Sequence, residues 1–236
     1  MLSLYHPLKG LFFEEHDEVK IAESDVEYLN AEVDALIAAR DLSVEEAEAI
    51  LRVELGSKVS EMKSKEPFKE KLTAIIPLIK KENLHFMVQK LSEIGVSDFV
   101  FYKPDLIDQS IAKKDHLKML EKCEEVIINA CKQCGSNFLP GSQMYLNIND
   151  AIDGLEDKTD VYVFDIQAIE TFKANEVLPE RDVCIISGPE SGFSESELET
   201  FKNKDLKMRI IGNNVLRAET APIVISTLVL NQFDRI

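Results

Sequence analysis

The sequence predicts an α/β protein in which a largely parallel sheet is covered by helices on both faces, preceded by a small N-terminal domain. From residue 72 onward, apolar segments of strand length alternate with amphipathic segments of helix length. Such alternation is typical of a parallel sheet whose strands are buried on both faces. Two of the apolar segments near the end of the chain run into glycine-bearing turns. Turns of this kind, where strands end, are where α/β proteins bind ligands.

The first 70 residues are expected to form the small domain. Two Ser-x-x-Glu capping boxes begin at Ser24 and Ser43, and apolar residues at helical spacing follow each of them. Residues 24–62 therefore indicate a helical hairpin, which a polar, proline-containing linker joins to the rest of the chain. The predicted domains are residues 1–70 and residues 71–236.

Within the second domain the alternation predicts strands and helices in a definite order. The strands are expected at 72–78, 96–102, 161–165, 183–186 and 206–211, and the helices at 83–94, 116–133, 194–202 and 220–233. Gly95 is expected to end the first of these helices, because glycine readily adopts the left-handed conformation of a C-terminal cap. Ser194 begins a further capping box, and Thr220 is expected to cap the last helix.

Composition limits the class of protein. The chain has 236 residues, 45% of them hydrophobic, which is enough for a sizeable core. It has no apolar run of the roughly 20 residues needed to span a membrane and no secretory signal pattern, so we expect a cytoplasmic protein without membrane contact. Cys131 and Cys134 have the spacing of a zinc or redox pair, but no second pair accompanies them. We therefore predict no metal site.

The charge of the chain is strongly acidic. Its 43 acidic and 27 basic side chains give a net charge of −16, which by itself argues against a nucleic-acid partner. The acidity is concentrated in residues 1–70, which hold 17 acidic and 8 basic side chains. Singly, each basic cluster of the remainder is typical of a solvated helix face or loop. These clusters are Lys80 and Lys81; Lys113, Lys114, His116, Lys118 and Lys122; and Lys202, Lys204, Lys207 and Arg209.

The first glycine-bearing turn is Gly188-Pro189-Glu190-Ser191-Gly192. We expect Gly188 and Gly192 to adopt backbone angles that other residues avoid and to let a ligand approach the main chain closely. The turn lacks the Gly-Lys-Ser/Thr ending of a P-loop and the Gly-x-Gly-x-x-Gly spacing of dinucleotide sites. On its own it fits a ligand site or a simple strand-to-helix connection.

The second turn adds a charged pair, Arg217 and Glu219, between Gly212 and the start of the last helix. The two side chains could form a salt bridge that only orders the loop. Alternatively, Arg217 could stabilise negative charge on a substrate while Glu219 fixes its orientation.

Together the two turns resemble the signature pair of a known family. Gly188-Pro189-Glu190-x-Gly192-Phe193-Ser194 followed by Leu216-Arg217-x-Glu219-Thr220-Ala221 is similar to the motifs of the RsmE family. These SPOUT-class methyltransferases methylate N3 of a uridine in small-subunit (16S) ribosomal RNA. The stretch 90–96, ending in Ile94-Gly95-Val96, and the segment 132–140 also resemble the family. The resemblance covers residues 72–236.

The resemblance implies a C-terminal trefoil knot that binds S-adenosylmethionine and a site completed by a second subunit, hence a homodimer. In the knot, the segment around Leu216 to Thr220 passes beneath an earlier loop. Most cofactor contacts would come from main-chain amides and carbonyls. The family's cofactor loops correspond here to Gly188, Pro189, Glu190, Gly192, Ile211, Gly212, Asn214, Leu216, Arg217 and Ala218.

The implied chemistry gives the charged pair a role. Uracil N3 carries a proton at neutral pH, so a positive group near the base would favour its anion. We assign that charge to Arg217 as a hypothesis, with Glu219 as the group that orients it. The two residues are thus the predicted catalytic pair.

Three departures from the family pattern qualify the expectations. Ser191 stands where the family usually has a second glycine, which requires ordinary backbone angles there. Ser136 stands where we align a family arginine. The acidic residues 24–62 occupy the place of the family's PUA-like barrel, so the barrel is either strongly diverged or replaced. Two readings follow: a ribosomal RNA methyltransferase, or a SPOUT-fold protein that binds S-adenosylmethionine or RNA without this activity and uses its N-terminal hairpin for protein interactions.

Overall fold

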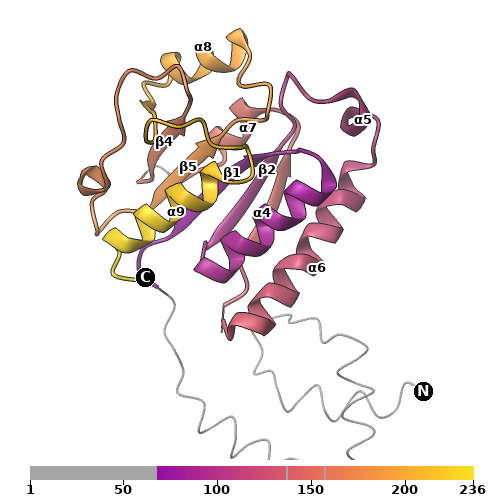
Figure 1. Ribbon diagram of the computed structural model, residues 1–236, viewed down its shortest axis with the longest axis horizontal. Coiled ribbons are helices and arrows are strands. Elements are labelled where there is room, and N and C mark those ends of the chain that lie inside the picture. Colours follow the sequence, from indigo (N-terminus) through magenta and orange to yellow (C-terminus); the bar gives the residue numbers. More distant parts are fainter. Residues whose placement is uncertain (1–67, 137, 157) are drawn as a thin grey trace, which may run out of the picture. The chain divides into compact units, whose positions relative to one another are not determined.

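The computed structural model describes residues 68–136, 138–156 and 158–236, and these form one α/β unit (Figure 1). Six strands make a single sheet in the order β3-β2-β1-β5-β4-β6, with all neighbours parallel. The strands are β1 (Leu72–Pro77), β2 (Asp98–Tyr102), β3 (Gly141–Tyr145), β4 (Asp160–Phe164), β5 (Val183–Ser187) and β6 (Lys207–Arg209). The helices are α4 (Lys81–Ile94), α5 (Gln109–Ala112), α6 (His116–Cys134), α7 (Ile148–Asp153), α8 (Glu195–Asn203) and α9 (Ala221–Gln232), with a 3-10 turn η1 (Ala174–Glu176).

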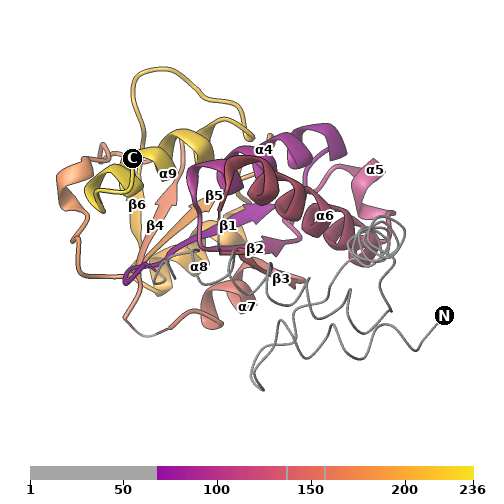
Figure 2. The same cartoon turned by 90° about the horizontal axis from the view of Figure 1, so that it is seen from below.

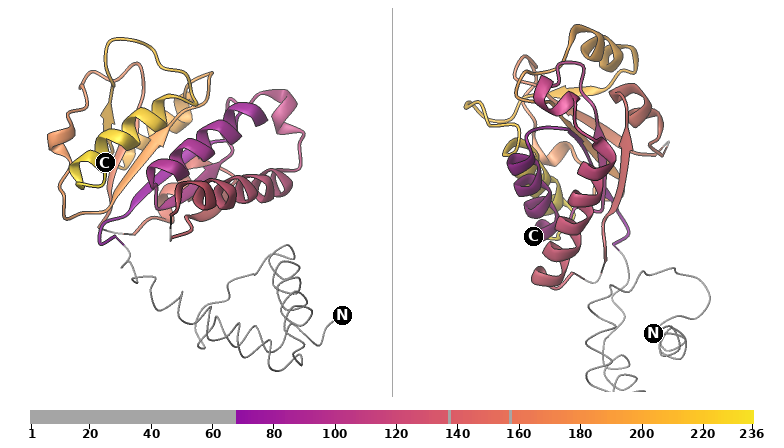
Figure 3. Two further views of the ribbon diagram at one scale, coloured as in Figure 1. Left: turned by 60° about the horizontal axis from the view of Figure 1, so that its bottom comes forward. Right: turned by 90° about the vertical axis from the view of Figure 1, so that its right-hand side faces the viewer.

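Helices cover both faces of the sheet. α4, α6 and α9 lie on one face, and α7 and α8 lie on the other (Figures 2 and 3). The side chains of each strand alternate between the two layers: Ala74 and Ile76 point into the core beneath α4 and α9, while Ile75 points into the core beneath α8. The predicted parallel sheet with helices on both faces is confirmed.

All crossovers between strands have the same hand. Connections that move toward β3 pass over the α4 face, through α4, α6 and η1. Connections that move toward β6 pass over the opposite face, through α7 and α8. A uniform hand is the rule for parallel sheets, and it brings β4, β5 and β6 side by side with their C-terminal ends at one edge.

The chain that leaves β6 passes between two parts of one earlier connection. On one side, the amide of Asp165, just after β4, donates to the carbonyl of Arg209 at 3.0 Å. On the other side, the amide of Ile210 donates to the carbonyl of Glu170 at 2.8 Å, and Phe172 donates back to Ile210 at 2.9 Å. Residues 165–172 therefore surround the exit of β6, as a trefoil knot requires. The knotted fold that the resemblance implied is the fold observed.

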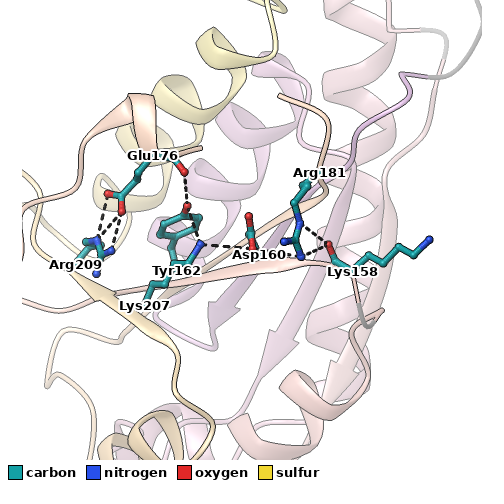
Figure 4. A network of polar contacts seen from close by, with 7 residues as sticks. All are labelled: Lys158, Asp160, Tyr162, Glu176, Arg181, Lys207 and Arg209. Atoms are coloured by element: carbon teal, nitrogen blue, oxygen red, sulfur yellow. Dashed lines mark hydrogen bonds and ion pairs between the residues drawn. The ribbon is translucent and has the colours of Figure 1, made fainter. Parts of the chain in front are cut away.

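Arg209 ties this crossing to η1. Its guanidinium donates to both oxygens of Glu176, at 2.8–3.2 Å (Figure 4). It also pairs with Glu170 at 2.8 Å. Burial alone would raise the pKa of the Glu176 carboxyl. The hydrogen bonds from Arg209 and from the Lys173 amide, together with the positive charges of Arg209 and Lys207, outweigh burial, and the pKa is lowered. The guanidinium thus holds the β4–β5 connection against the strand that crosses it.

The basic cluster at residues 202–209 is largely engaged in such contacts. Lys207 pairs with Asp160 at 3.5 Å and lies over the ring of Tyr162 (Figure 4). Lys204 pairs with Asp153. Arg181 approaches the same Asp160 carboxylate at 3.5 Å. These ion pairs hold the cations at the edge of the sheet, whereas the sequence interpretation of the cluster was a solvated helix face or loop.

Most predicted elements are confirmed, and the exceptions have physical causes. β3 was not predicted because its sequence, Gly-Ser-Gln-Met-Tyr, lies at a half-exposed edge and lacks an apolar pattern. The short elements α5, α7 and η1 were also missed. Thr220 does occupy the N-cap position of α9, but its backbone is already helical and its side chain makes no capping bond, so that part of the prediction was wrong. Ser194 does form the predicted capping box.

Two predictions are not tested by the described residues. The hairpin at 24–62 lies outside the described residues, and the domain boundary near residue 70 stays a prediction. In the described part of the chain, no helix has the length and apolar character needed to cross a bilayer.

Replacing Arg209 with methionine removes the donors but keeps the length of the side chain. We expect the free energy of unfolding to fall by about 2 kcal/mol, because Glu176 would lose its charged partner while partly buried. Urea unfolding measures this. Arg181→Met is the matched control, since the Arg181 side chain is more exposed than that of Arg209 and its partner Asp160 keeps a second cation, Lys207. It should cost less than about 1 kcal/mol. Equal losses in the two variants would contradict the role given to Arg209.

The loss of unfolding free energy caused by Arg209→Met should also depend on pH. Because the folded-state pKa of Glu176 lies below the reference value of 4.5, the pair stabilises fully above that value. The contribution disappears as the pH falls through the lower, folded pKa. The difference in unfolding free energy between wild type and Arg209→Met should therefore narrow below pH 4.5. A difference that stays constant into acid would argue against an ion pair.

Candidate active site

A cavity of about 410 Å³ opens where the loops after β4, β5 and β6 meet. The three strands are neighbours and run in parallel, so their C-terminal ends bring residues from distant parts of the sequence to one place. The volume lies within the range of small-molecule sites. The cavity therefore has the position and size of a ligand site.

The structure brings most of the predicted site residues together at this cavity. The predicted residues that line it are Gly188, Pro189, Glu190, Gly192, Leu216, Arg217, Ala218 and Glu219. The other three, Ile211, Gly212 and Asn214, line an adjoining cavity of about 110 Å³. Both cavities share Phe164, Val215 and Leu216, so one continuous surface contains all the predicted positions.

Sequence reasoning missed the part of the cavity wall that comes from the end of β4. Phe164, Asp165 and Ile166, at the end of β4, line both cavities. Ser187 and Phe193 also line the larger one. A signal existed for the β4 residues, because the strand predicted at 161–165 had to end at the same edge as its parallel neighbours. The order of the strands, which would have made them adjacent, is absent from the sequence pattern.

The two glycines of the first turn serve different purposes. Gly192 has φ 76°, in the left-handed region that favours glycine, and nothing lies within 4 Å of where its Cβ would stand. Gly188 keeps an ordinary φ, contrary to expectation. A Cβ there would meet the ring of Phe193 at 3.2 Å, so the absence of a side chain permits close packing. Gly212, in the second turn, has φ 62°.

Ser191 is compatible with the turn, as its position requires. Its φ is negative, and its hydroxyl donates to the carbonyl of Leu106 at 2.8 Å. Two further bonds join the same loops: Ser194 to the Asp105 carboxylate at 2.6 Å, and the Asp105 amide to Glu197 at 3.2 Å. The loop after β2 therefore holds the signature turn in place.

Arg217 and Glu219 occupy the mouth of the cavity as a loose pair. Their closest nitrogen–oxygen distance is 3.7 Å; the Arg217 side chain is 83% exposed and that of Glu219 is 10% exposed. The ion pair that both sequence interpretations assumed is present. Because the guanidinium extends into solvent while the carboxylate is buried, Arg217 is free to contact a substrate arriving from outside.

The cysteines lie away from this site. Cys123, Cys131 and Cys184 are buried and Cys134 is exposed, all as free thiols. Burial raises the pKa of the Cys123 thiol to about 12, so it stays protonated. Over residues 68–136, 138–156 and 158–236, no three His, Cys, Asp or Glu side chains come together as metal ligands would.

The threaded parallel sheet and the three-loop cavity define a class of protein, the knotted α/β proteins of SPOUT type. The structure of a ribosomal RNA small subunit methyltransferase E from Neisseria gonorrhoeae, bound to S-adenosyl methionine, shares the fold with TM-score 0.60 and 22% identity, over 69% of this chain and 66% of that one. A protein from Legionella pneumophila, solved with bound SAM, matches with TM-score 0.60, 24% identity and the same coverage.

Sequence comparisons then identify the family. The model of the RNA methyltransferase domain matches residues 65–230. The ribosomal RNA small subunit methyltransferase E of Mesomycoplasma hyopneumoniae is 24% identical over 72% of this chain and 73% of its own length. The Helicobacter pylori protein of the same name is 26% identical over 67% of this chain and 66% of its own length. The chain belongs to the RNA methyltransferase domain family, within its RsmE branch. It spans about two thirds of the length of these relatives.

Replacing Gly192 with alanine tests the first turn. We expect a loss of about 1–2 kcal/mol in unfolding free energy, because alanine is strained in the left-handed region, and a weaker affinity for the cavity's ligand. Gly135→Ala is the matched control, since Gly135 has φ 71°, open space around its Cβ position and a place at the end of α6. Urea unfolding and calorimetry measure the two effects. An affinity loss in both variants would show that strain alone is responsible.

Proposed function

We propose that this protein is an S-adenosylmethionine-dependent methyltransferase that modifies N3 of a uridine in small-subunit ribosomal RNA. The observation that carries the proposal is the three-loop cavity, which unites the two signature turns and places Arg217 at its mouth. The alternative, a protein that binds without catalysis, is not favoured because the relatives are named as enzymes. A ribosomal RNA substrate would place the protein in the cytoplasm.

The residues present fit S-adenosylmethionine. The cavity has room for a nucleoside-sized molecule, and the open space beside Gly192 exposes its main chain. Gly188, Gly192 and Leu216 would hold the molecule through backbone groups. Apolar side chains such as Phe164 and Val215 would cover its rings. Bound there, S-adenosylmethionine would supply a sulfonium methyl group to a nucleophile in line with the carbon–sulfur bond.

The protein's own contribution would be positioning and charge. For N3 to attack the methyl group, its proton must pass to solvent water and its electron pair must become available. The guanidinium of Arg217 would stabilise the resulting negative charge, which spreads over N3 and the neighbouring carbonyl oxygens. Glu219 would orient that guanidinium through the pair already present. The role of these two residues is therefore electrostatic.

Cations at the same edge of the sheet would support RNA binding. Lys80 and Lys81 begin α4, directly after β1, and Lys80 lines a cavity of about 200 Å³ that shares Pro189 and Glu190 with the cofactor cavity. Lys113 and Lys114, just after α5, are also exposed. Such side chains would contact phosphates near the reacting base. In the third basic cluster, Lys204, Lys207 and Arg209 are paired with acidic side chains, so they would contribute less to RNA binding.

A homodimer is the assembly we propose. α9 is predominantly apolar and its apolar residues are spread around the helix, yet Val224 is exposed on it. A helix that is apolar all round is normally buried on all sides. Val215 and Ile166, beside the cavity, are 77% and 62% exposed. A second copy that covers these side chains would also close the site around Arg217.

Replacing Arg217 with alanine should lower kcat at least about 100-fold, because the developing charge loses its partner. The affinity for S-adenosylmethionine should stay within about threefold, since the cavity holds it mainly through backbone groups. Methyl transfer to small-subunit RNA and calorimetry measure these two quantities. Arg217→Lys, which keeps the charge, should retain part of the activity. Unchanged turnover in Arg217→Ala would refute the assignment.

Replacing Val224 with glutamate should convert the dimer to a monomer, because a charge would be buried against the second copy. Analytical ultracentrifugation of the full chain measures this. Leu117→Glu is the control, since Leu117 is an exposed apolar residue on α6. It should leave the dimer intact. A monomeric wild type, or a Val224→Glu variant that stays dimeric, would exclude this interface.

A further inference from the structure

Glu197, in the first turn of α8, is a buried carboxylate beside the first signature turn, residues 188–192. It is 3% exposed, and no Lys, Arg or His of the described residues forms an ion pair with it. Both oxygens accept main-chain hydrogen bonds instead, Oε1 from the Asp105 amide at 3.2 Å and Oε2 from the Ser194 amide at 2.8 Å. A buried anion without a cation is costly, so its presence here calls for an explanation.

The carboxylate closes a ring of hydrogen bonds between two loops. The Ser194 hydroxyl accepts from the Glu197 amide at 3.1 Å and donates to the Asp105 carboxylate at 2.6 Å. Asp105 belongs to the loop after β2, whereas Ser194 follows the signature turn by two residues. Glu197 and Ser194 therefore fasten the start of α8 to the loop after β2.

The ring of hydrogen bonds is connected to the cavity through Phe193. That side chain lines the cavity, and its aromatic ring packs edge-on against Phe201 of α8, with the centroids 4.9 Å apart. The same aromatic ring lies 3.2 Å from the position of a Cβ on Gly188. A shift at the start of α8 would therefore move Phe193, and with it the turn from Gly188 to Gly192.

We propose that Glu197, in its charged form, is a positioning residue for S-adenosylmethionine: its carboxylate holds the first signature turn in the shape that binds the cofactor, and protonation releases the turn. The inference rests on the proposed function and adds to it a control of cofactor affinity by pH. A carboxylate accepts at both oxygens, whereas the neutral acid turns one oxygen into a donor that faces an amide. One of the two loop contacts is then lost. Glu197 does not line the cavity, so it acts only through the turn.

The surroundings of Glu197 favour its protonation at a higher pH than that of an exposed glutamate. Burial raises its pKa above the usual 4.5, and the charge of Asp105 raises it further against the opposing effect of the amide hydrogen bonds. The nearby Tyr102 hydroxyl, on β2, stays neutral because burial and the same two carboxylates raise its pKa. On α7, which packs against α8, Asp153 is paired with Lys204. Cofactor affinity should therefore be full above the raised pKa of Glu197 and fall as the pH drops through it.

Replacing Glu197 with glutamine separates this role from a purely structural one. Glutamine has the same shape, but only one of its two terminal atoms can accept a hydrogen bond. In the full chain at neutral pH we expect the affinity for S-adenosylmethionine, measured by calorimetry, to fall roughly threefold to tenfold, because the binding-competent turn is populated only part of the time. At saturating S-adenosylmethionine, kcat should stay within about twofold of the wild-type value, since Glu197 touches no reacting atom.

The pH profile is the readout that a structural role would not change. Wild-type affinity should fall from neutral pH toward pH 4.5 and meet that of Glu197→Gln, whose profile lacks this step. The titration of the ligand is common to both proteins and cancels in the comparison. Glu199→Gln is the matched control, because Glu199 is exposed on the same helix. It should keep both the affinity and the pH profile of the wild type.

Parallel profiles of wild type and Glu197→Gln would overturn this inference while leaving the proposed function intact. If Glu197→Gln fails to fold, Glu197→Asp carries the test, since its shorter side chain keeps the charge but cannot reach both amides. It should lose affinity to a similar extent, and wild-type affinity in this variant would likewise overturn the inference. A wild-type protein that binds no S-adenosylmethionine at neutral pH would refute both the inference and the proposed function.

Discussion

The backbone hydrogen bonds around the exit of β6 are the constraint on which the candidate site depends. Asp165 holds the strand end from one side, and the stretch from Glu170 to Phe172 holds it from the other. Because of this crossing, the chain after β6 cannot leave along the edge of the sheet and must turn back toward β5. The loop that contains Arg217 is thereby placed opposite the turn that contains Gly188. Without the crossing the two signature turns would not face one cavity.

Charge is divided between two tasks on the molecule. At the β6 edge, Arg209 and Lys207 neutralise Glu176 and Asp160 and stabilise the crossing. At the C-terminal ends of the strands, Arg217 reaches into solvent beside a cavity whose walls are mainly loops. A negative net charge is therefore compatible with an RNA substrate, because local cations and not the total determine which surface meets phosphate.

Sequence reasoning succeeded where a local pattern determines the structure. The capping box at Ser194, the stop at Gly95 and the left-handed Gly192 each depend on a few neighbouring residues, and each is observed. Sequence reasoning failed where tertiary neighbours determine the local structure. β3 forms at an edge without an apolar pattern, and Gly188 is required by the ring of Phe193 and not by its backbone angle. The wall at Phe164 to Ile166 was missed because strand order cannot be read from the chain.

The sequence by itself determined the alternation of strands and helices, the two turns and the residues that fill them, because hydrophobic period and glycine placement act locally. It also carried the resemblance that named Arg217 and Glu219. Only the tertiary structure decided that β4, β5 and β6 lie side by side, that the chain crosses itself after Arg209, and that the Glu197 carboxylate is buried against the loop after β2. These are properties of long-range packing, in which residues far apart in the chain compete for the same few contacts.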